Sequence, residues 1–269
     1  MNSALLSTAE PEGSLLGETL GKWWGPSPTP VVAELEHREH SRIPWYNLGQ
    51  YLLDRGKVFM LDVVGGIPEE LWSLTSLTSL NLARNYLTGP LSSSIANLTQ
   101  MQLLNLGANA LSGEVPKELG KLTNLTDLNI GTNNFSGSLP LELGYLVKLE
   151  RLYFDSSGVS GAIPSTFAGL KNLQIVRSSD NELTGSIPEF IGNWSELSIL
   201  RISDLSNGSS SLAFLKDMTS LSTLILRNNN ISGTIPTNIG DFQSLSQLFL
   251  GNNKLTGMLP ALKSPLLHM

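Results

Sequence analysis

Arginine and tyrosine side chains recur at a fixed interval in the second half of the chain. Tyr153, Arg177 and Arg201 stand 24 residues apart. Arginine offers a planar fork of hydrogen-bond donors that suits carboxylates, and tyrosine and arginine often anchor protein interfaces. Their types and spacing therefore suit recognition of a ligand. The full set that we predict as a binding surface comprises Arg151, Tyr153, Asp155, Arg177, Arg201, Arg227 and Phe249.

A structural interpretation of the same arginines stays open beside the binding one. Asp155, Asp180 and Asp204 lie close to the arginines in the repeating interval. Pairs of opposite charge on neighbouring strands form solvated ion pairs that contribute little energy and need no ligand. A binding scan in which Arg177→Ala and Tyr153→Ala left affinity unchanged would exclude the binding interpretation.

Residues for catalysis or metal binding are scarce. The chain has three histidines, and His37 and His40 lie in "ELEHREH", which lacks the H-E-x-x-H spacing of a zinc site. A solvated charged helix is the favoured interpretation of that run. No cysteine is present, which excludes thiolate metal sites, disulfides and a cysteine nucleophile. We predict no enzymatic activity, no cofactor and no metal.

The charge and hydropathy of the chain exclude further classes of partner and segment. A net charge of -6 and a pI near 5.1 provide no broad basic surface, so nucleic acid is not an expected partner. No stretch approaches the roughly 18 consecutive apolar residues of a membrane span. The first 20 residues lack the basic and apolar regions of a signal peptide.

The interval of 24 arises from an internal repeat that must position these side chains. The consensus is L-x-x-L-x-x-L-x-L-x-x-N-x-L-x-G-x-I-P, as in "LTNLTDLNIGTNNFSGSLP" at 122–140. Its copies begin at Leu74, Leu98, Leu122, Leu146, Leu170, Trp194, Met218 and Phe242. The L-x-L pair has the period of two of a short strand. Because one unit cannot bury its leucines alone, the units must stack with their strands parallel.

Residues between the inward leucines must then point out of the core. At the central position this outward column reads Asn81, Asn105, Asn129, Tyr153, Arg177, Arg201, Ile225 and Phe249. Asp127 and Arg151 lie two places earlier. Asp155, Ser179, Ser203 and Arg227 lie two places later. The first half of this surface is small and rich in amides, whereas the second half collects arginine and aromatic side chains.

The asparagine of the consensus has a structural explanation. It follows the strand at a buried turn, where its amide can bond the backbone of its own and of an adjacent coil. We predict this ladder at Asn85, Asn109, Asn133, Asn181, Asn229 and Asn253. Ser157 and Leu205 replace the asparagine in the fourth and sixth copies, where we expect a weaker ladder. The G-x-[IVL]-P turns predict an irregular, extended or 3₁₀ outer side rather than a long helix.

The G-x-[IVL]-P half of the unit resembles the plant-specific class of leucine-rich repeats, found in receptor-like kinase ectodomains and in inhibitors of polygalacturonases. Segments such as "KVFMLDVVGGIPEELWSLTSLTSLNLARNYLTG" (57–89) and "SDNELTGSIPEFIGNW" (179–194) are similar to the branch in which a malectin-like domain, a membrane span and a serine/threonine kinase follow the repeats. The resemblance covers residues 57–267. It implies an α/β-type leucine-rich-repeat solenoid, right-handed and curved, with a concave parallel sheet.

Two parts of the chain depart from that family. Residues 1–56 cannot supply the cysteine-paired cap of family ectodomains, so they are either an atypical, poorly ordered leader or a substitute cap using Trp23, Trp24, Trp45 and Tyr46. The sixth copy lacks the asparagine and the G-x-I-P turn. There we predict a short helix capped by a serine at 209–211, with Leu212 and Leu215 facing inward.

The resemblance implies an extracellular, non-catalytic module that binds a protein, peptide or cell-wall carbohydrate, with a possible co-receptor. Kinase motifs are absent, so we interpret the chain as truncated to the repeats. Six N-x-[S/T] sequons are candidate glycosylation sites: Asn97, Asn124, Asn134, Asn193, Asn207 and Asn230. Two alternatives stay open, a soluble inhibitor of a wall-degrading enzyme and a cytosolic interaction scaffold. Inhibition of a polygalacturonase, or glycan attachment, would separate them.

Overall fold

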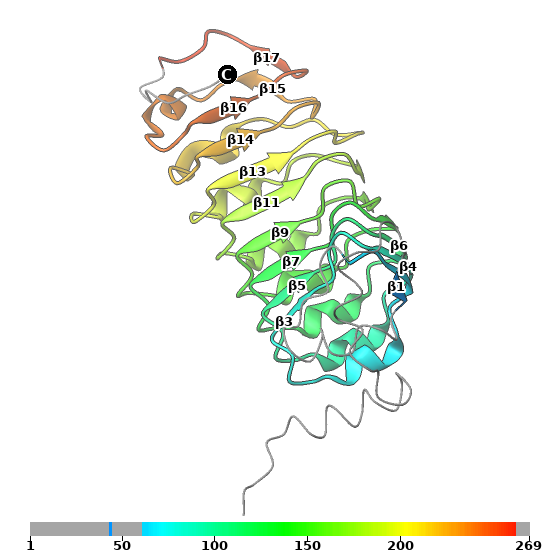
Figure 1. Ribbon diagram of the computed structural model, residues 1–269. Coiled ribbons are helices and arrows are strands. Elements are labelled where there is room, and N and C mark those ends of the chain that lie inside the picture. Colours follow the sequence, from blue (N-terminus) through cyan, green and yellow to red (C-terminus); the bar gives the residue numbers. More distant parts are fainter. Residues whose placement is uncertain (1–42, 45–60, 262–269) are drawn as a thin grey trace, which may run out of the picture.

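The computed structural model describes residues 43–44 and 61–261, and in this part the chain winds into a solenoid with one coil per 24-residue unit (Figure 1). One strand from each coil joins a parallel sheet of eight strands in chain order. These strands are β3 (Ser79–Asn81), β5 (Leu103–Asn105), β7 (Asp127–Asn129), β9 (Arg151–Tyr153), β11 (Ile175–Ser178), β13 (Ile199–Ile202), β14 (Thr223–Ile225) and β16 (Gln247–Phe249). The predicted leucine-rich-repeat solenoid is confirmed.

The strands pair in one register along the array. Leu80 lies opposite Leu104, and Leu104 lies opposite Leu128. Both leucines of the L-x-L pair point inward: Leu80 and Leu82 are fully buried. Burying a leucine contributes roughly 1.5–3 kcal/mol, and stacked coils repeat this contribution along one continuous core.

Short 3₁₀ helices cover the side opposite the sheet (Figure 1). Six of those described begin directly after a proline of the repeat motif, whose fixed φ near -65° suits the N-cap position. Before η5 a serine replaces proline, and Ser92 Oγ accepts a hydrogen bond from the Ser94 N–H. The helices are η4 (Glu69–Ser73), η5 (Ser93–Asn97), η6 (Lys117–Lys121), η7 (Leu141–Tyr145), η8 (Ser165–Gly169), η9 (Glu189–Asn193), η10 (Ala213–Asp217) and η11 (Thr237–Asp241).

Further short strands follow the asparagine of most coils, and their pairing into sheets was not predicted from the sequence pattern. A five-stranded parallel sheet has the order β1-β2-β4-β6-β8, and the later strands form two separate pairs, β10-β12 and β15-β17. These strands are β1 (Ile43–Pro44), β2 (Val63–Gly66), β4 (Tyr86–Gly89), β6 (Ala110–Glu114), β8 (Asn134–Ser136), β10 (Ser160–Gly161), β12 (Glu182–Leu183), β15 (Ser232–Thr234) and β17 (Lys254–Thr256). The 3₁₀ and extended segments of the outer side agree with the prediction.

The ladder asparagines lie between coils and bond to both. Asn133 illustrates the arrangement: its Nδ2 donates to the carbonyl of Ile130 in its own coil and to that of Leu106 in the preceding coil. Its Oδ1 accepts from the N–H of Leu111 in the preceding coil at 3.1 Å. Equivalent bonds to the preceding coil are made by Asn85, Asn109, Asn181, Asn229 and Asn253.

The two exceptional copies keep the stack intact. Ser157 and Leu205 are buried, and the backbone N–H of each donates to the ladder asparagine of the next coil. In the sixth copy, Leu212 and Leu215 are buried beside η10 as predicted. The predicted serine N-cap is wrong, because the N-cap residue is Leu212 and no side chain caps η10. Ser211 Oγ accepts from the Ala213 N–H at 3.3 Å.

The predictions for the N-terminal leader fall mostly outside the described residues, including those for Trp23, Trp24, Trp45 and Tyr46 and for the histidines. From this segment the structure describes Ile43–Pro44, which pair with Val63 and Val64 of β2. Among residues 43–44 and 61–261, no helix has the length and apolar character to cross a membrane.

Candidate ligand-binding face

The outward residues of the eight-stranded sheet form one continuous column on the concave face. Backbone pairing places Asn129 beside Tyr153, Tyr153 beside Arg177, and Arg177 beside Arg201. The same register continues to Ile225 and Phe249. The predicted side chains, 24 residues apart in the sequence, are therefore immediate neighbours in space. We call these outward residues, with those two places to either side, the concave column.

The first half of the concave column is rich in amides. Asn105 Oδ1 accepts from the Gly107 N–H, and Asn129 Oδ1 accepts from the Gly131 N–H. A Cβ added at Gly107 would lie 2.8 Å from Oδ1 of Asn129, so a larger residue there requires the Asn129 amide to shift.

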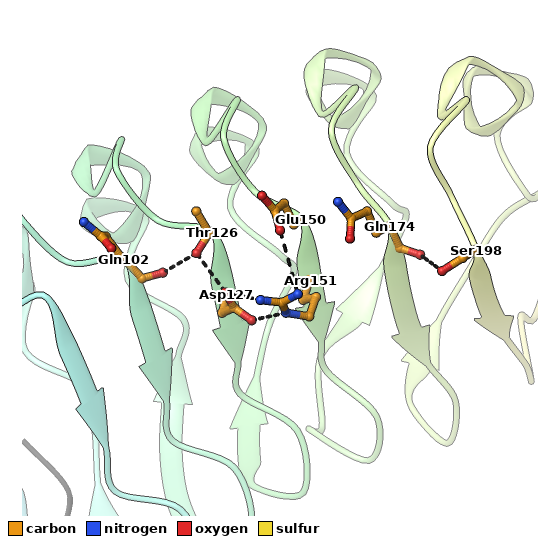
Figure 2. A network of polar contacts seen from close by, with 7 residues as sticks. All are labelled: Gln102, Thr126, Asp127, Glu150, Arg151, Gln174 and Ser198. Carbon is orange, nitrogen blue, oxygen red and sulfur yellow. Dashed lines mark hydrogen bonds and ion pairs between the residues drawn. The ribbon is translucent and has the colours of Figure 1, made fainter. Parts of the chain in front are cut away.

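Arg151 forms ion pairs with two neighbouring acidic side chains. Its guanidinium forms an ion pair with Asp127 on the preceding strand, and its Nη1 lies 3.7 Å from Glu150 Oε2 (Figure 2). The hydrogen bond to Asp127 raises the pKa of Arg151 above its ordinary value. The Thr126 hydroxyl lies 2.8 Å from Asp127 Oδ2. Arg151 is therefore held in place by Asp127.

Tyr153 and Arg177 form a stacked pair in the middle of the face. The Arg177 Cζ lies 5.5 Å from the centroid of the Tyr153 ring, within the range of a cation–π contact. Burial raises the pKa of the Tyr153 phenol, and the neighbouring Arg177 and Arg151 charges lower it. The phenol is therefore a neutral donor at physiological pH, beside a cation that no acid neutralises in the described part of the chain.

The acids that we considered as arginine partners make other contacts. Asp155 Oδ1 accepts from the backbone N–H of Ser179 at 3.0 Å. Asp204 Oδ1 accepts from the Asn228 amide at 2.6 Å. Within residues 61–261 the ion pairs involve Arg151, and the geometry gives none between the other column arginines and Asp155, Asp180 or Asp204.

A hollow lies at the C-terminal half of the concave column, with a volume of about 240 Å³. Arg201, Arg227 and Phe249 line it, and the Arg227 Cζ lies 4.9 Å from the centroid of the Phe249 ring. Asp180, Ser203 and Asn228 complete its polar wall. The repeat pattern places the arginines on one face but does not reveal this hollow, because its shape depends on how side chains of four coils pack.

The asparagines of the six sequons differ in exposure and in the hydrogen bonds of their side-chain amides. Asn97, Asn134, Asn193 and Asn207 are exposed. By contrast, Nδ2 of Asn124 donates to the Thr99 carbonyl of the preceding coil, and Nδ2 of Asn230 donates to the Gly208 carbonyl. In the described residues no group of three histidine or acidic side chains could hold a metal ion.

Comparison with known sequences supports the repeat assignment. The family described as Leucine Rich Repeat matches residues 76–98, 124–146 and 220–242. No curated protein matches this sequence.

Solved structures with similar folds include ectodomains of plant receptors. The plant peptide hormone receptor RGFR1 in complex with RGF2 is 31% identical, with a TM-score of 0.69 over 72% of this chain and 31% of that one. A TDR receptor is 35% identical, with a TM-score of 0.70 over 74% of this chain and 34% of that one. The Arabidopsis receptor kinase HAESA, in complex with the peptide hormone IDA and the co-receptor SERK1, is 32% identical. Its TM-score is 0.67 over 74% of this chain and 33% of that one. This chain therefore spans about a third of the length of these structures.

Proposed function

We propose that this chain is a non-catalytic ligand-binding module of a plant cell-surface receptor kinase, and that it binds a protein or peptide on its concave face. The observation that carries the proposal is the in-register placement of Tyr153, Arg177 and Arg201 across neighbouring strands. Clustered tyrosine and arginine side chains on a rigid sheet are typical of interface anchors. Since Arg177 and Arg201 form no ion pair in residues 61–261, they are available to a ligand.

The similar structures support this class of partner. RGFR1 and HAESA are solved as complexes with RGF2 and with the peptide hormone IDA, and HAESA also with the co-receptor SERK1. We extend this to the present chain as a proposal: a peptide or protein ligand, with a co-receptor as a second partner. The resemblance at 57–89 and 179–194 supports the further assignment to the branch in which a malectin-like domain follows the repeats, and to the repeat portion of such a receptor.

Selection from a peptide display library tests the binding face even though the natural ligand is unidentified. Peptides are selected on the wild-type protein and then measured against Arg177→Ala, Tyr153→Ala and the convex control Lys121→Ala, which removes one exposed positive charge. We expect both concave variants to weaken binding about 30-fold, since interface anchors are worth about 2 kcal/mol or more. The control should bind as the wild type does. Equal affinity of all four proteins would refute the concave face as the binding site.

Expression through a secretory pathway tests the extracellular assignment. We expect mass spectrometry to find glycans at exposed sequons, with Asn97 and Asn193 at the ends of η5 and η9 as the first candidates. Both lie on the 3₁₀ side of the solenoid, so glycans there would leave the concave column open. A secreted, folded protein with no glycan at any sequon would argue against the extracellular assignment and favour a cytosolic scaffold.

A further inference from the structure

Arg201 lies in the concave hollow without an anionic partner. It forms no ion pair within the described residues, and its Nε–H is shielded from solvent and has no hydrogen-bond acceptor there. A shielded cationic donor without an acceptor is costly, because it has lost water and gained nothing in exchange. An anion that enters the hollow would relieve this cost once the guanidinium turns toward it. Arg227 lines the same hollow and adds a second positive charge.

The hollow also contains hydrogen-bond acceptors. A simple anion has no donors to pair with them. Asp180 lines it, is exposed, and makes no hydrogen bond or ion pair within the described part of the chain. Asp204 lines it too, although one of its oxygens accepts from Asn228. These carboxylates repel a bare anion but accept hydrogen bonds from hydroxyl groups. The complementary ligand therefore carries one carboxylate and several hydroxyl donors.

The volume of the hollow and its apolar residues further limit the kind of ligand that fits. A volume of about 240 Å³ is below the roughly 300–1,000 Å³ of sites for drug-sized ligands, so the hollow suits a single small ring. Ile225 and Phe249 supply an apolar wall. An acidic peptide side chain would satisfy the arginines but would leave Asp180 without donors. A carboxylated sugar ring satisfies the arginines, the acids and the apolar wall together.

We propose that the hollow centred on Arg201 binds a uronic acid, a sugar ring that carries one carboxylate. The carboxylate lies between Arg201 and Arg227, and ring hydroxyls donate to Asp180 and Asp204. A net charge of -6 disfavours diffuse attraction of polyanions to the rest of the surface, so such binding depends on this local site. The inference rests on the proposed function in that both use the concave face, but it names a different ligand chemistry.

Titration calorimetry with galacturonate, a single sugar ring with one carboxylate, tests the proposal directly. We expect saturable binding by the wild type, binding at least about tenfold weaker for Arg201→Ala because charge-assisted hydrogen bonds are lost, and unchanged binding for Lys121→Ala. Melting temperatures equal to that of the wild type establish that the variants fold. No binding, or equal binding by Arg201→Ala, would overturn the proposal.

A second variant separates a sugar acid from a plain carboxylate. Asp180→Ala is compatible with the backbone, because Ala108 adopts φ 56° at the equivalent position of another coil and Asp180 has φ 57°. We expect this variant to weaken galacturonate binding but not acetate binding, since acetate has no hydroxyl groups. If acetate or an acidic peptide competes as strongly as galacturonate, the site is a plain anion site and the sugar assignment is wrong. If the sugar does not bind but peptide binding still depends on Tyr153, this inference is wrong and the proposed function stands.

Discussion

The asparagine ladder makes the sharpest prediction about stability. In Asn133→Ala, the Ile130 and Leu106 carbonyls lose a donor at 3.0 and 3.1 Å, and the Leu111 N–H loses its acceptor at 3.1 Å. Each such bond contributes about 1 kcal/mol net, and a buried group left without a partner costs about 1–3 kcal/mol. Because the Leu106 carbonyl keeps Asn109 as a donor, we expect a total loss of about 3 kcal/mol.

Equilibrium urea unfolding of unglycosylated protein measures this loss as a lower transition midpoint at an unchanged slope. Asn134→Ala is the matched control, since it makes the same substitution at the next residue, which is exposed. Surface changes of this kind usually alter stability by no more than about 0.5 kcal/mol. Equal midpoints for the two variants would refute the claim that the ladder amides join successive coils.

Local contacts lead to three more expected outcomes. Gly120→Ala would place a Cβ 2.5 Å from a carbonyl oxygen of the next coil and should cost about 1–3 kcal/mol, whereas Gly251→Ala meets nothing within 4 Å and should be neutral in thermal melts. Arg177→Ala removes a charge that lowers the pKa of Tyr153, so this pKa should rise further above its ordinary value, as followed by NMR of the phenol carbon at alkaline pH. Because the folded state then holds the phenol proton more tightly than the unfolded state, stability should fall as pH rises past the unfolded pKa. Ser178→Ala removes a buried hydroxyl that has no hydrogen-bond partner, so the free energy of unfolding should rise by about 1 kcal/mol and the urea midpoint should rise with it. A lower midpoint would contradict this reasoning.

The sequence predicts the main sheet well because each coil carries its own signal. The alternation of Leu80 and Leu82 fixes which side chains point inward, and the exact interval of 24 fixes the register of neighbouring strands. The asparagine positions follow from the same logic, since an amide at a buried turn needs backbone partners. Leu212 and Leu215 could be placed inside even in a coil that had lost its motif.

The five-stranded sheet could not be predicted in the same way. Strands such as Tyr86–Gly89 and Ala110–Glu114 are short, bury one leucine each and contain glycine at positive φ, so no alternation marks them. They exist because stacked coils bring equivalent segments side by side. A residue with φ near 56° also precedes Asn85 and Asn109, although Arg84 and Ala108 are not types that favour this conformation.

The site was predictable as a surface but not as a set of contacts. The column positions of Tyr153, Arg177 and Arg201 follow from the repeat, whereas the partner of each charge depends on side-chain rotamers. Asp155 accepts from a backbone N–H rather than from an arginine, and Arg177 stacks on Tyr153. These choices decide which cations are available to a ligand, and no single-sequence pattern encodes them.

Hydroxyl-radical footprinting of the protein with a selected peptide tests the central claim most directly. Tyr153 lies on the concave face, and Tyr145 at the end of η7 is an exposed tyrosine of the opposite side. If the concave column binds the ligand, saturation with peptide lowers the oxidation rate of Tyr153 and leaves that of Tyr145 unchanged. Protection of Tyr145 with no change at Tyr153 would contradict the account.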